Sequence, residues 1–439
     1  MRSKVPVPGS DSGSRSATRA GAMLALAGVV LFVSSLVVGA ALAPDVGAAG
    51  DGETRRTLVG SQGGGPGLHE KGSVYLLEGR DIQWRAGDTD SYFDVTMLPD
   101  GRVMAGFMDS GYTDCGPYDA PCTHTGFRVI DPNAGSGAEP EIVREYSFPV
   151  RTRKNSEVHD VERLSPGKYL VTDMEYERIF IVSDGEITWQ WNASERYDAP
   201  ADPTRTDWLH INDVDVISED RYLVSVRNAH QLVIVERGEG VVEVINADED
   251  RNRDENPNPK GDPTVLRQQH NPQWLGNGTV LVADSHNDRI VELRRNRSGD
   301  WNVAWALYGA EGVKFNWPRD ADRLPNGNTL ITDSLNKRIV EVNRTGATVW
   351  SYQTPQVPYE ADRLPAGETV GGIAYADGNG ATTIGESGDV PVLSFLLVVL
   401  QTGLQTPFWF TEAHVAVALV SLACVLGGAG MVLRGQLRG

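Results

Sequence analysis

Short hydrophobic runs alternate with polar turns between Gly72 and Gly378, and no stretch of this region has a sustained helical period. Runs such as 279–283 and 289–293 alternate apolar and polar residues, a pattern that predicts strands. Several repeats end in a further strand that carries a tryptophan: Trp191, Trp305 and Trp350. The pattern predicts an all-β fold built from repeated antiparallel units.

A hydrophobic residue followed by a turn recurs six times, at Leu98, Leu164, Ile217, Leu275, Leu324 and Leu364. These anchors lie 66, 53, 58, 49 and 40 residues apart, a range that overlaps the length of one four-stranded propeller blade. Val74–Trp84 resembles the outer two strands of a blade, and Tyr359–Tyr375 supplies an anchor turn and an inner strand. Joined, the two pieces complete a blade and close the ring. We therefore predict a six-bladed β-propeller over residues 73–380.

The position five residues before each anchor is predicted to line the central channel, because equivalent positions of successive blades form a ring. The residues at this position are Phe93, His159, Asn212, His270, Arg319 and Tyr359. Two histidines, an arginine and an asparagine would then share one axial space. The alternative is a channel whose polar side chains only bind water.

A second motif recurs in the turns between strands, as Asp284-Ser-His-Asn-Asp-Arg289 and Asp333-Ser-Leu-Asn-Lys-Arg338, with a weaker copy at 173–178. It resembles the NHL type of propeller repeat, in which Asp and Arg brace neighbouring strands. Because the motif repeats, a structural role is expected for it, and for His286 within it.

Apolar segments lie near both ends of the chain. Gly21–Leu42 has no charge over 22 residues, enough to cross a hydrocarbon core of about 30 Å. Its alternative is a cleaved signal peptide, since Ala41-Leu42-Ala43 has the form of a cleavage site. Basic residues flank the outer ends of both segments, which favours internal termini and an external middle. The predicted parts are a cytoplasmic tail (1–20), a membrane helix (21–43), a linker (44–72), the propeller (73–380), a second linker (381–411), a membrane helix (412–434) and a tail (435–439).

The second linker contains an apolar run, Val390–Leu400, which is followed by Gln401, Gln405 and Pro407. A third crossing would place the basic C-terminal residues outside, against the positive-inside tendency. We expect an interfacial or re-entrant segment instead.

An external middle domain permits a disulfide and glycosylation. Cys115 and Cys122 enclose a short turn-rich loop, which favours a local disulfide over metal binding by two thiols. Sequons begin at Asn192, Asn277, Asn296 and Asn343. No metal or cofactor is predicted.

Composition excludes one class of partner. The formal net charge is −19 and no basic stripe is present, so nucleic-acid binding is not expected. Only 7 of the 40 basic residues are lysine, which suits a halophile's hydrated acidic surface or reflects codon bias.

Several stretches that do not repeat resemble the arylsulfate sulfotransferases. They are Asp207-Trp-Leu-His210-Ile-Asn212, Val224-Ser-Val-Arg227, Gln269-His270 and His159-Asp160. The resemblance implies a six-bladed propeller that transfers a sulfuryl group between phenols through a sulfated histidine, without a nucleotide donor. Asp213 stands where the family usually has a serine.

The resemblance also implies roles for individual residues. His270 would be the nucleophile, while His210, Asn212 and Arg227 would hold the sulfuryl oxygens and His159 would complete the pocket. We further expect three ring residues to contact the substrate: Arg319, Tyr359 and Phe93. This inventory suits the chemistry, because a neutral imidazole attacks sulfur while fixed donors and a permanent cation hold its oxygens.

Three functional hypotheses follow. The first is a membrane-anchored, outward-facing sulfotransferase that takes an aryl sulfate donor and a hydroxyl acceptor and contacts lipid through two helices. The second is a non-catalytic propeller that binds a surface protein or glycan. The third is a hydrolase or lyase that uses the same histidines.

Overall fold

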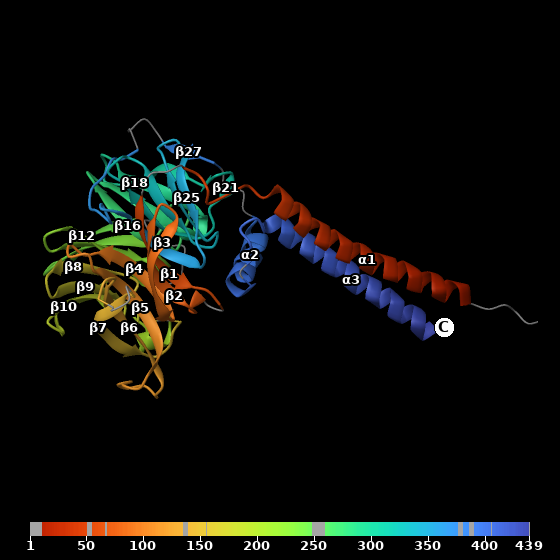
Figure 1. Cartoon of the computed structure of the whole chain (residues 1–439), viewed down its shortest axis with the longest axis horizontal. Coiled ribbons are helices and arrows are strands. Elements are labelled where there is room, and N and C mark those ends of the chain that lie inside the picture. The colour runs from red at the N-terminus through yellow and green to blue at the C-terminus, as the bar shows by residue number, and fades with distance from the viewer. Residues whose placement is uncertain are drawn as a thin grey trace, which may run out of the picture. The chain divides into compact units, whose positions relative to one another are not determined.

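The computed structural model describes residues 11–50, 55–65, 68–134, 139–154, 156–247, 260–375, 381–385, 390–404 and 406–438. The chain divides into two compact units (Figure 1). One comprises residues 45–387 and is built of strands, and the other comprises 1–44 and 388–439 and is built of helices.

Among the described residues, six sheets of four or more strands form the body of the strand unit, as predicted for a six-bladed propeller, and the four main strands of each are antiparallel. Five of them take their strands in chain order, with the innermost strand first. The first of these blades contains β4 (Ser91–Met97), β5 (Val103–Tyr112), β6 (Cys122–Asp131) and β7 (Glu141–Val150), and the second contains β8 (Val161–Ser165), β9 (Lys168–Asp173), β10 (Arg178–Ser183) and β11 (Glu186–Asn192). The third contains β12 (Ile211–Ser218), β13 (Arg221–Val226), β14 (Gln231–Glu236) and β15 (Gly240–Ile245), and the fourth contains β16 (His270–Gly276), β17 (Thr279–Asp284), β18 (Arg289–Arg295) and β19 (Trp301–Leu307). The fifth contains β22 (Pro318–Arg323), β23 (Thr329–Asp333), β24 (Arg338–Val342) and β25 (Thr348–Gln353).

The sixth sheet closes the ring with strands from both ends of the propeller. Its order is β26 (Val357–Leu364), β1 (Arg56–Gly63), β2 (Gly72–Glu78) and β3 (Asp81–Thr89). The composite blade is therefore as predicted, but the sequence analysis missed one strand. β1 lies in the range 44–72, expected to be a linker, because its apolar run is short and is followed by glycines. It is buried between β26 and β2, which supply its hydrogen-bond partners on both sides.

Successive blades pack face to face through apolar side chains. In one such cluster, Leu170 and Ile181 of one blade pack with Val214 and Val224 of the next. The tryptophans of the outer strands, Trp191, Trp305 and Trp350, are each at most 2% exposed.

The repeated turn motif braces the strands on either side of it. Arg178, Arg289 and Arg338 each place Nε 2.7 Å from a carboxylate oxygen of the aspartate five residues earlier. The expected structural role of these Asp–Arg pairs is confirmed by this geometry.

Smaller additions extend the blades. A short hairpin consists of β20 (Gly309–Ala310) and β21 (Val313–Lys314), and β27 (Thr382–Ile384) pairs in parallel with β19. β27 lies in the range 381–411, expected to be a linker, so the strand unit extends beyond residue 380.

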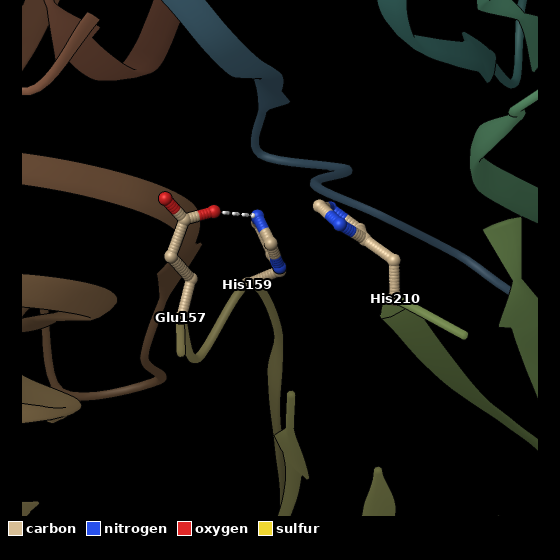
Figure 2. A group of neighbouring side chains, drawn as sticks. All are labelled: Glu157, His159 and His210. Carbon is tan, nitrogen blue, oxygen red and sulfur yellow. Dashed lines mark ion pairs between the residues drawn. The ribbon is translucent and has the colours of Figure 1, made fainter. Parts of the chain in front are cut away.

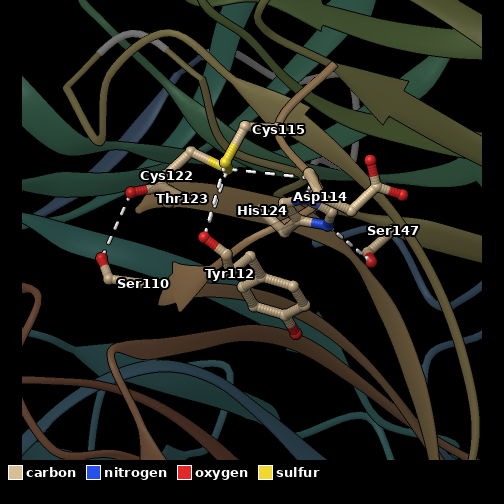
Figure 3. The surroundings of a disulfide bond; sticks show 8 residues. All are labelled: Ser110, Tyr112, Asp114, Cys115, Cys122, Thr123, His124 and Ser147. Carbon is tan, nitrogen blue, oxygen red and sulfur yellow. Dashed lines mark hydrogen bonds between the residues drawn. A yellow bond between two sulfur atoms is a disulfide. The ribbon is translucent and has the colours of Figure 1, made fainter. Parts of the chain in front are cut away.

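The predicted disulfide is present in the loop between β5 and β6 (Figure 3). The Cα atoms of Cys115 and Cys122 lie 5.8 Å apart. His124 secures the same loop, because its Nε2 lies 2.6 Å from the carbonyl oxygen of Asp114 and its ring stacks on Tyr112.

The helical unit contains α1 (Asp11–Leu42), α2 (Pro391–Leu404) and α3 (Glu412–Arg438). Two segments are long and apolar enough to cross a membrane, Arg15–Leu42 and Glu412–Leu437. α1 begins ten residues earlier than the predicted span and includes part of the predicted tail 1–20, whose residues 1–10 lie outside the described residues. α1 and α3 pack closely, since a Cβ at Gly28 would lie 2.7 Å from the carbonyl oxygen of Ser421.

Candidate active site

The six predicted channel residues are all buried, and they lie at the start of the innermost strands or, for His159, two residues before β8. Tyr359 on β26 is the residue around which they gather. Its ring centroid lies 5.3 Å from that of Phe93, 5.5 Å from that of His159 and 6.2 Å from that of His270. The guanidinium carbon of Arg319 lies 5.0 Å from the same centroid. Because these residues come from five different blades, their contacts identify a shared axial pocket.

Asn212 joins this group through the backbone next to His270. Its Nδ2 donates a hydrogen bond of 2.9 Å to the carbonyl oxygen of Gln269. The amide is thereby oriented, and its Oδ1 has no partner among the described residues.

His270 is held by a hydroxyl group. Its Nδ1 lies 2.8 Å from Oγ of Ser285, and that Oγ lies 2.7 Å from the carbonyl oxygen of Pro318. A carbonyl only accepts, so we assign the hydroxyl proton to the bond with Pro318 and the Nδ1 proton to the bond with Ser285. The assignment leaves Nε2 of His270 with its lone pair available for attack.

The surroundings of His270 favour its neutral form. Burial is the largest cause that lowers its pKa, and the positive charges of Arg319 and Arg227 lower the pKa further. The pKa of His270 therefore lies well below 6.5. A neutral imidazole is the form that a nucleophile requires.

His159 has a carboxylate partner instead. Its Nε2 lies 2.5 Å from Oε2 of Glu157, whose other oxygen lies 3.0 Å from Nε2 of His69. Figure 2 shows the ring of His159 between Glu157 and His210. Burial alone raises the pKa of Glu157, but the two histidines outweigh it, and the net pKa lies well below its usual range. Glu157 is therefore an anion that fixes His159, whose Nδ1 has no partner among the described residues.

His210 lies beside His159, with 5.1 Å between the ring centroids. Its Nδ1 lies 2.8 Å from Oδ2 of Asp207, and its backbone N–H donates to Glu177 of the preceding blade. Burial and the nearby Arg227 lower the pKa of His210 to about 4. The ring is thus neutral at pH 7 and oriented from two sides.

The two arginines of the pocket differ in how fully they are bound. Arg227 begins the turn after β13, and its Nη1 lies 3.1 Å from Oδ1 of Asn228 and 4.0 Å from Oδ2 of Asp207. Arg319 donates to Gln62 and stacks on Trp317, with its guanidinium carbon 4.3 Å from that ring centroid. Nε of each arginine is buried without a partner among the described residues.

Unpartnered polar atoms therefore converge on one space. They are Nδ1 of His159, Oδ1 of Asn212, Nε of Arg227, Nε of Arg319 and the hydroxyl of Tyr359. Buried polar groups are nearly always hydrogen-bonded in folded proteins, so a group of exceptions needs an explanation. Three of the five are fixed N–H or O–H donors and two of these are cationic, which suits an anionic ligand.

The same side chains could in principle hold a metal ion. Glu157, His159 and His210 each place a ligand atom within 4.8 Å of the others. However, the 2.5 Å separation of the Glu157 and His159 atoms fits a direct hydrogen bond. Two tetrahedral ligands at 2.0–2.1 Å from an ion would lie about 3.3 Å apart. The geometry therefore favours an acid–base pair.

The structure brings together all eight residues predicted for the site, and it adds partners that the sequence analysis missed. Ser285 occupies the turn position that Arg227 occupies one blade earlier, so comparison of equivalent turns could have identified it. Glu157 precedes His159 by two residues, and no other blade has a glutamate at the equivalent position, so the repeat does not single it out. His69 lies in the range expected to be a linker.

Comparison with known proteins supports the resemblance predicted from the sequence. Residues 154–298 match the family described as Arylsulfotransferase (ASST). The matched range contains His159, His210, Asn212, Arg227 and His270. The match supports aryl sulfotransferase activity in general, with an aryl sulfate donor and an acceptor. No curated protein matches the chain.

Solved structures with some similarity include a protein of unknown function from Bacteroides caccae, with a TM-score of 0.48 and 14% identity over 71% of this chain and 99% of that one. The periplasmic gluconolactonase PpgL of Pseudomonas aeruginosa gives a TM-score of 0.41 and 12% identity over 70% and 98%. Virginiamycin B lyase from Staphylococcus aureus gives a TM-score of 0.35 and 11% identity, over 60% of this chain and 70% of that one.

Proposed function

We propose that this protein transfers a sulfuryl group from an aryl sulfate ester to a phenolic or other hydroxyl acceptor, through a sulfohistidine at His270. The observation that carries the proposal is the neutral imidazole of His270 in a pocket of unpartnered donors and two arginines. A sulfate ester keeps its negative charge throughout the reaction, so such donors stabilise both the bound ester and the transition state.

In the first half-reaction, Nε2 of His270 attacks sulfur in line with the aryl oxygen. The N–S bond forms as the S–O bond to the aryl group breaks, and the phenolate leaves with the bonding electrons. The imidazolium form of His159, which the negative charge of Glu157 at 2.5 Å stabilises, donates a proton to that phenolate. Burial lowers the pKa of His159 in the free protein, and the negative charge of a bound sulfate ester raises it again.

In the second half-reaction, the acceptor hydroxyl replaces the phenol. Its oxygen attacks sulfur, the N–S bond breaks and the electron pair returns to Nε2 of His270. Neutral His159 takes the acceptor's proton and is again the acid for the next donor, so the proton is conserved over the cycle. Ping-pong kinetics are the expected signature.

The partners of the three histidines support this division of roles. His159 and His210 each have one nitrogen on a carboxylate, which opposes the lowering of their pKa by burial and suits acid–base work or contact with an anion. His270 has a hydroxyl partner, which orients the ring without stabilising its charged form.

We further propose that α1 and α3 anchor the protein in a membrane with both termini inside and the propeller outside. The two helices pack in antiparallel order, since Gly21 contacts Gly428 while Gly39 contacts His414. This order supports placing both termini on one side. α2, with 14 residues, is about 21 Å long and too short to cross, which favours an interfacial position. Added protease should digest the propeller of intact cells and spare epitope tags at both termini, and digestion of the C-terminal tag would contradict this topology.

The activity is tested with the full chain in detergent, 4-nitrophenyl sulfate and a panel of phenols. The proposal predicts that nitrophenol is released only when an acceptor is present, and that one sulfated acceptor forms for each nitrophenol released. Release that is independent of acceptor and yields free sulfate would indicate a hydrolase. No release with any aryl sulfate would favour the non-catalytic propeller.

A further inference from the structure

A tier of carboxylates follows the channel residues directly. In five blades the next residue is acidic: Asp94, Asp160, Asp213, Asp320 and Glu360. Three of these brace neighbouring blades, because each accepts a backbone N–H two positions beyond the channel residue of the next blade. The donors are Val214 for Asp160 at 2.6 Å, Ala361 for Asp320 at 3.1 Å and Val95 for Glu360 at 3.3 Å. These carboxylates therefore have a structural task.

Asp213 departs from this pattern. The equivalent position in the next blade is Pro272, which has no N–H, and Oδ2 of Asp213 has no partner among the described residues.

A second tier lies three residues after the channel position, and one of its members, Glu162, accepts a backbone hydrogen bond from Val216 of the next blade. Its members include Glu162 on β8, Asp215 on β12 and Asp362 on β26. Glu368, in the turn after β26, joins them: one oxygen each of Glu162, Asp215 and Glu368 lie within 4.8 Å of one another. The blades of β26 and β12 are three apart in a ring of six, so their carboxylates can meet only across the channel.

The side chains of Asp215 and Glu368 hydrogen-bond to each other, but other carboxylate oxygens of this tier have no partner among the described residues. Oδ2 of Asp215 and both oxygens of Asp362 are buried without a partner among the described residues, and the two side chains are 3% and 1% exposed. The charged groups that act on Glu162, Asp215, Asp362 and Glu368 are other carboxylates. Buried anions without partners are costly unless a cation compensates them.

We propose that Glu162, Asp215, Asp362 and Glu368 bind one calcium ion in the central channel, about 10 Å from the histidine pocket at about 3.3 Å per strand residue. Four carboxylates supply four to eight oxygens, and calcium takes 6–8 at 2.3–2.6 Å. One oxygen each of Glu162, Asp215 and Glu368 is close enough to the others to contact a single ion at these distances. Magnesium binds at 2.0–2.1 Å, retains its waters and fits this set less well.

The ion would connect β8 and β12 to the segment that closes the ring. Asp362 and Glu368 belong to that segment, whereas Glu162 and Asp215 belong to two blades on the far side of the channel. Half-buried Glu162 and Glu368 leave the ion a route from solvent. The expected effect is a more stable propeller, independent of sulfuryl transfer.

Calcium binding to the detergent-solubilised full chain tests the proposal. Protein treated with EDTA and dialysed should take up one calcium ion per chain, measured by elemental mass spectrometry. Its Tm should rise by about 4 °C at a calcium concentration of 100 times Kd, and magnesium at the same concentration should raise it less. No uptake up to about 1 mM calcium, the weak end for calcium modules, would overturn the proposal and leave the carboxyls protonated.

Matched variants locate the ion. Glu162→Gln and Asp362→Asn should each lower calcium affinity at least tenfold, whereas Glu186→Gln, an exposed change on the outer strand of the blade that contains Glu162, should leave it unchanged. Calcium uptake that is equal in all three variants would overturn the assignment. Because uptake and Tm are measured without an aryl sulfate, the result does not depend on the proposed activity.

Discussion

Nδ1 of His270 lies 2.8 Å from the hydroxyl oxygen of Ser285, and this contact decides which ring nitrogen is free. The hydroxyl gives its proton to the carbonyl of Pro318 at 2.7 Å, so it receives the Nδ1 proton and leaves Nε2 as the nucleophile. A repeated structural turn of the propeller thus supplies the residue that orients His270.

Ser285→Ala should lower the rate of sulfuryl transfer about tenfold, because one hydrogen bond of about 1.4 kcal/mol no longer favours the reactive tautomer. Ser334 is the matched control, since it occupies the same turn position one blade later and its Oγ has no partner among the described residues. Steady-state kinetics of both variants check the prediction. An equal loss in Ser334→Ala would reduce Ser285 to a packing role.

Arg227→Lys should lower kcat/KM about 100-fold while the fold is retained, because lysine keeps the charge but loses the planar donor set. Arg319→Lys should cost less, since Arg319 already donates to Gln62 and stacks on Trp317. Kinetics with 4-nitrophenyl sulfate, with circular dichroism for folding, compare the two. The reverse order of losses would assign the main anion contact to Arg319.

Glu157→Gln should slow transfer from phenyl sulfate at least about tenfold more than transfer from 4-nitrophenyl sulfate. A poor leaving group needs the proton from His159, whereas nitrophenolate leaves without one. Because a merely structural defect would slow both donors alike, an equal effect on the two would contradict the acid–base role. Glu186→Gln is the control for loss of a carboxylate.

In the pH profile of kcat/KM for 4-nitrophenyl sulfate, the midpoint of the fall in activity on the acidic side should lie below pH 6.5. Burial, with the charges of Arg319 and Arg227, lowers the pKa of His270, and only its protonated form lacks the nucleophilic lone pair. Activity should therefore persist as pH falls through 6.5 and disappear only near the lowered pKa. Rates from about pH 8 to pH 5, with circular dichroism at each pH, check this. A midpoint at or above 6.5 would show that His270 is not the group that titrates.

The channel residues could be predicted because they occupy one position of a repeat. Tyr359 and His159 are far apart in sequence, yet each lies five residues before the residue that opens an anchor turn. The same counting, carried one and three residues further, would have revealed the two acidic tiers.

The partners of the site could not be predicted in this way. Glu157 and His69 meet through the closure of the ring, and no period relates their positions. β1 was taken for a linker because its strand character comes from burial between two other strands rather than from a long alternating run.

Detection of a sulfohistidine tests the central claim most directly. The full chain is incubated with 4-nitrophenyl sulfate without acceptor, and its intact mass and peptides are then measured. The account predicts one added SO₃ group on His270 that disappears when a phenol is supplied. His270→Asn, which keeps a donor for Ser285 but lacks Nε2, should show neither adduct nor transfer, whereas His286→Ala should show both. Transfer by His270→Asn at a near wild-type rate, or an adduct on another residue, would contradict the account.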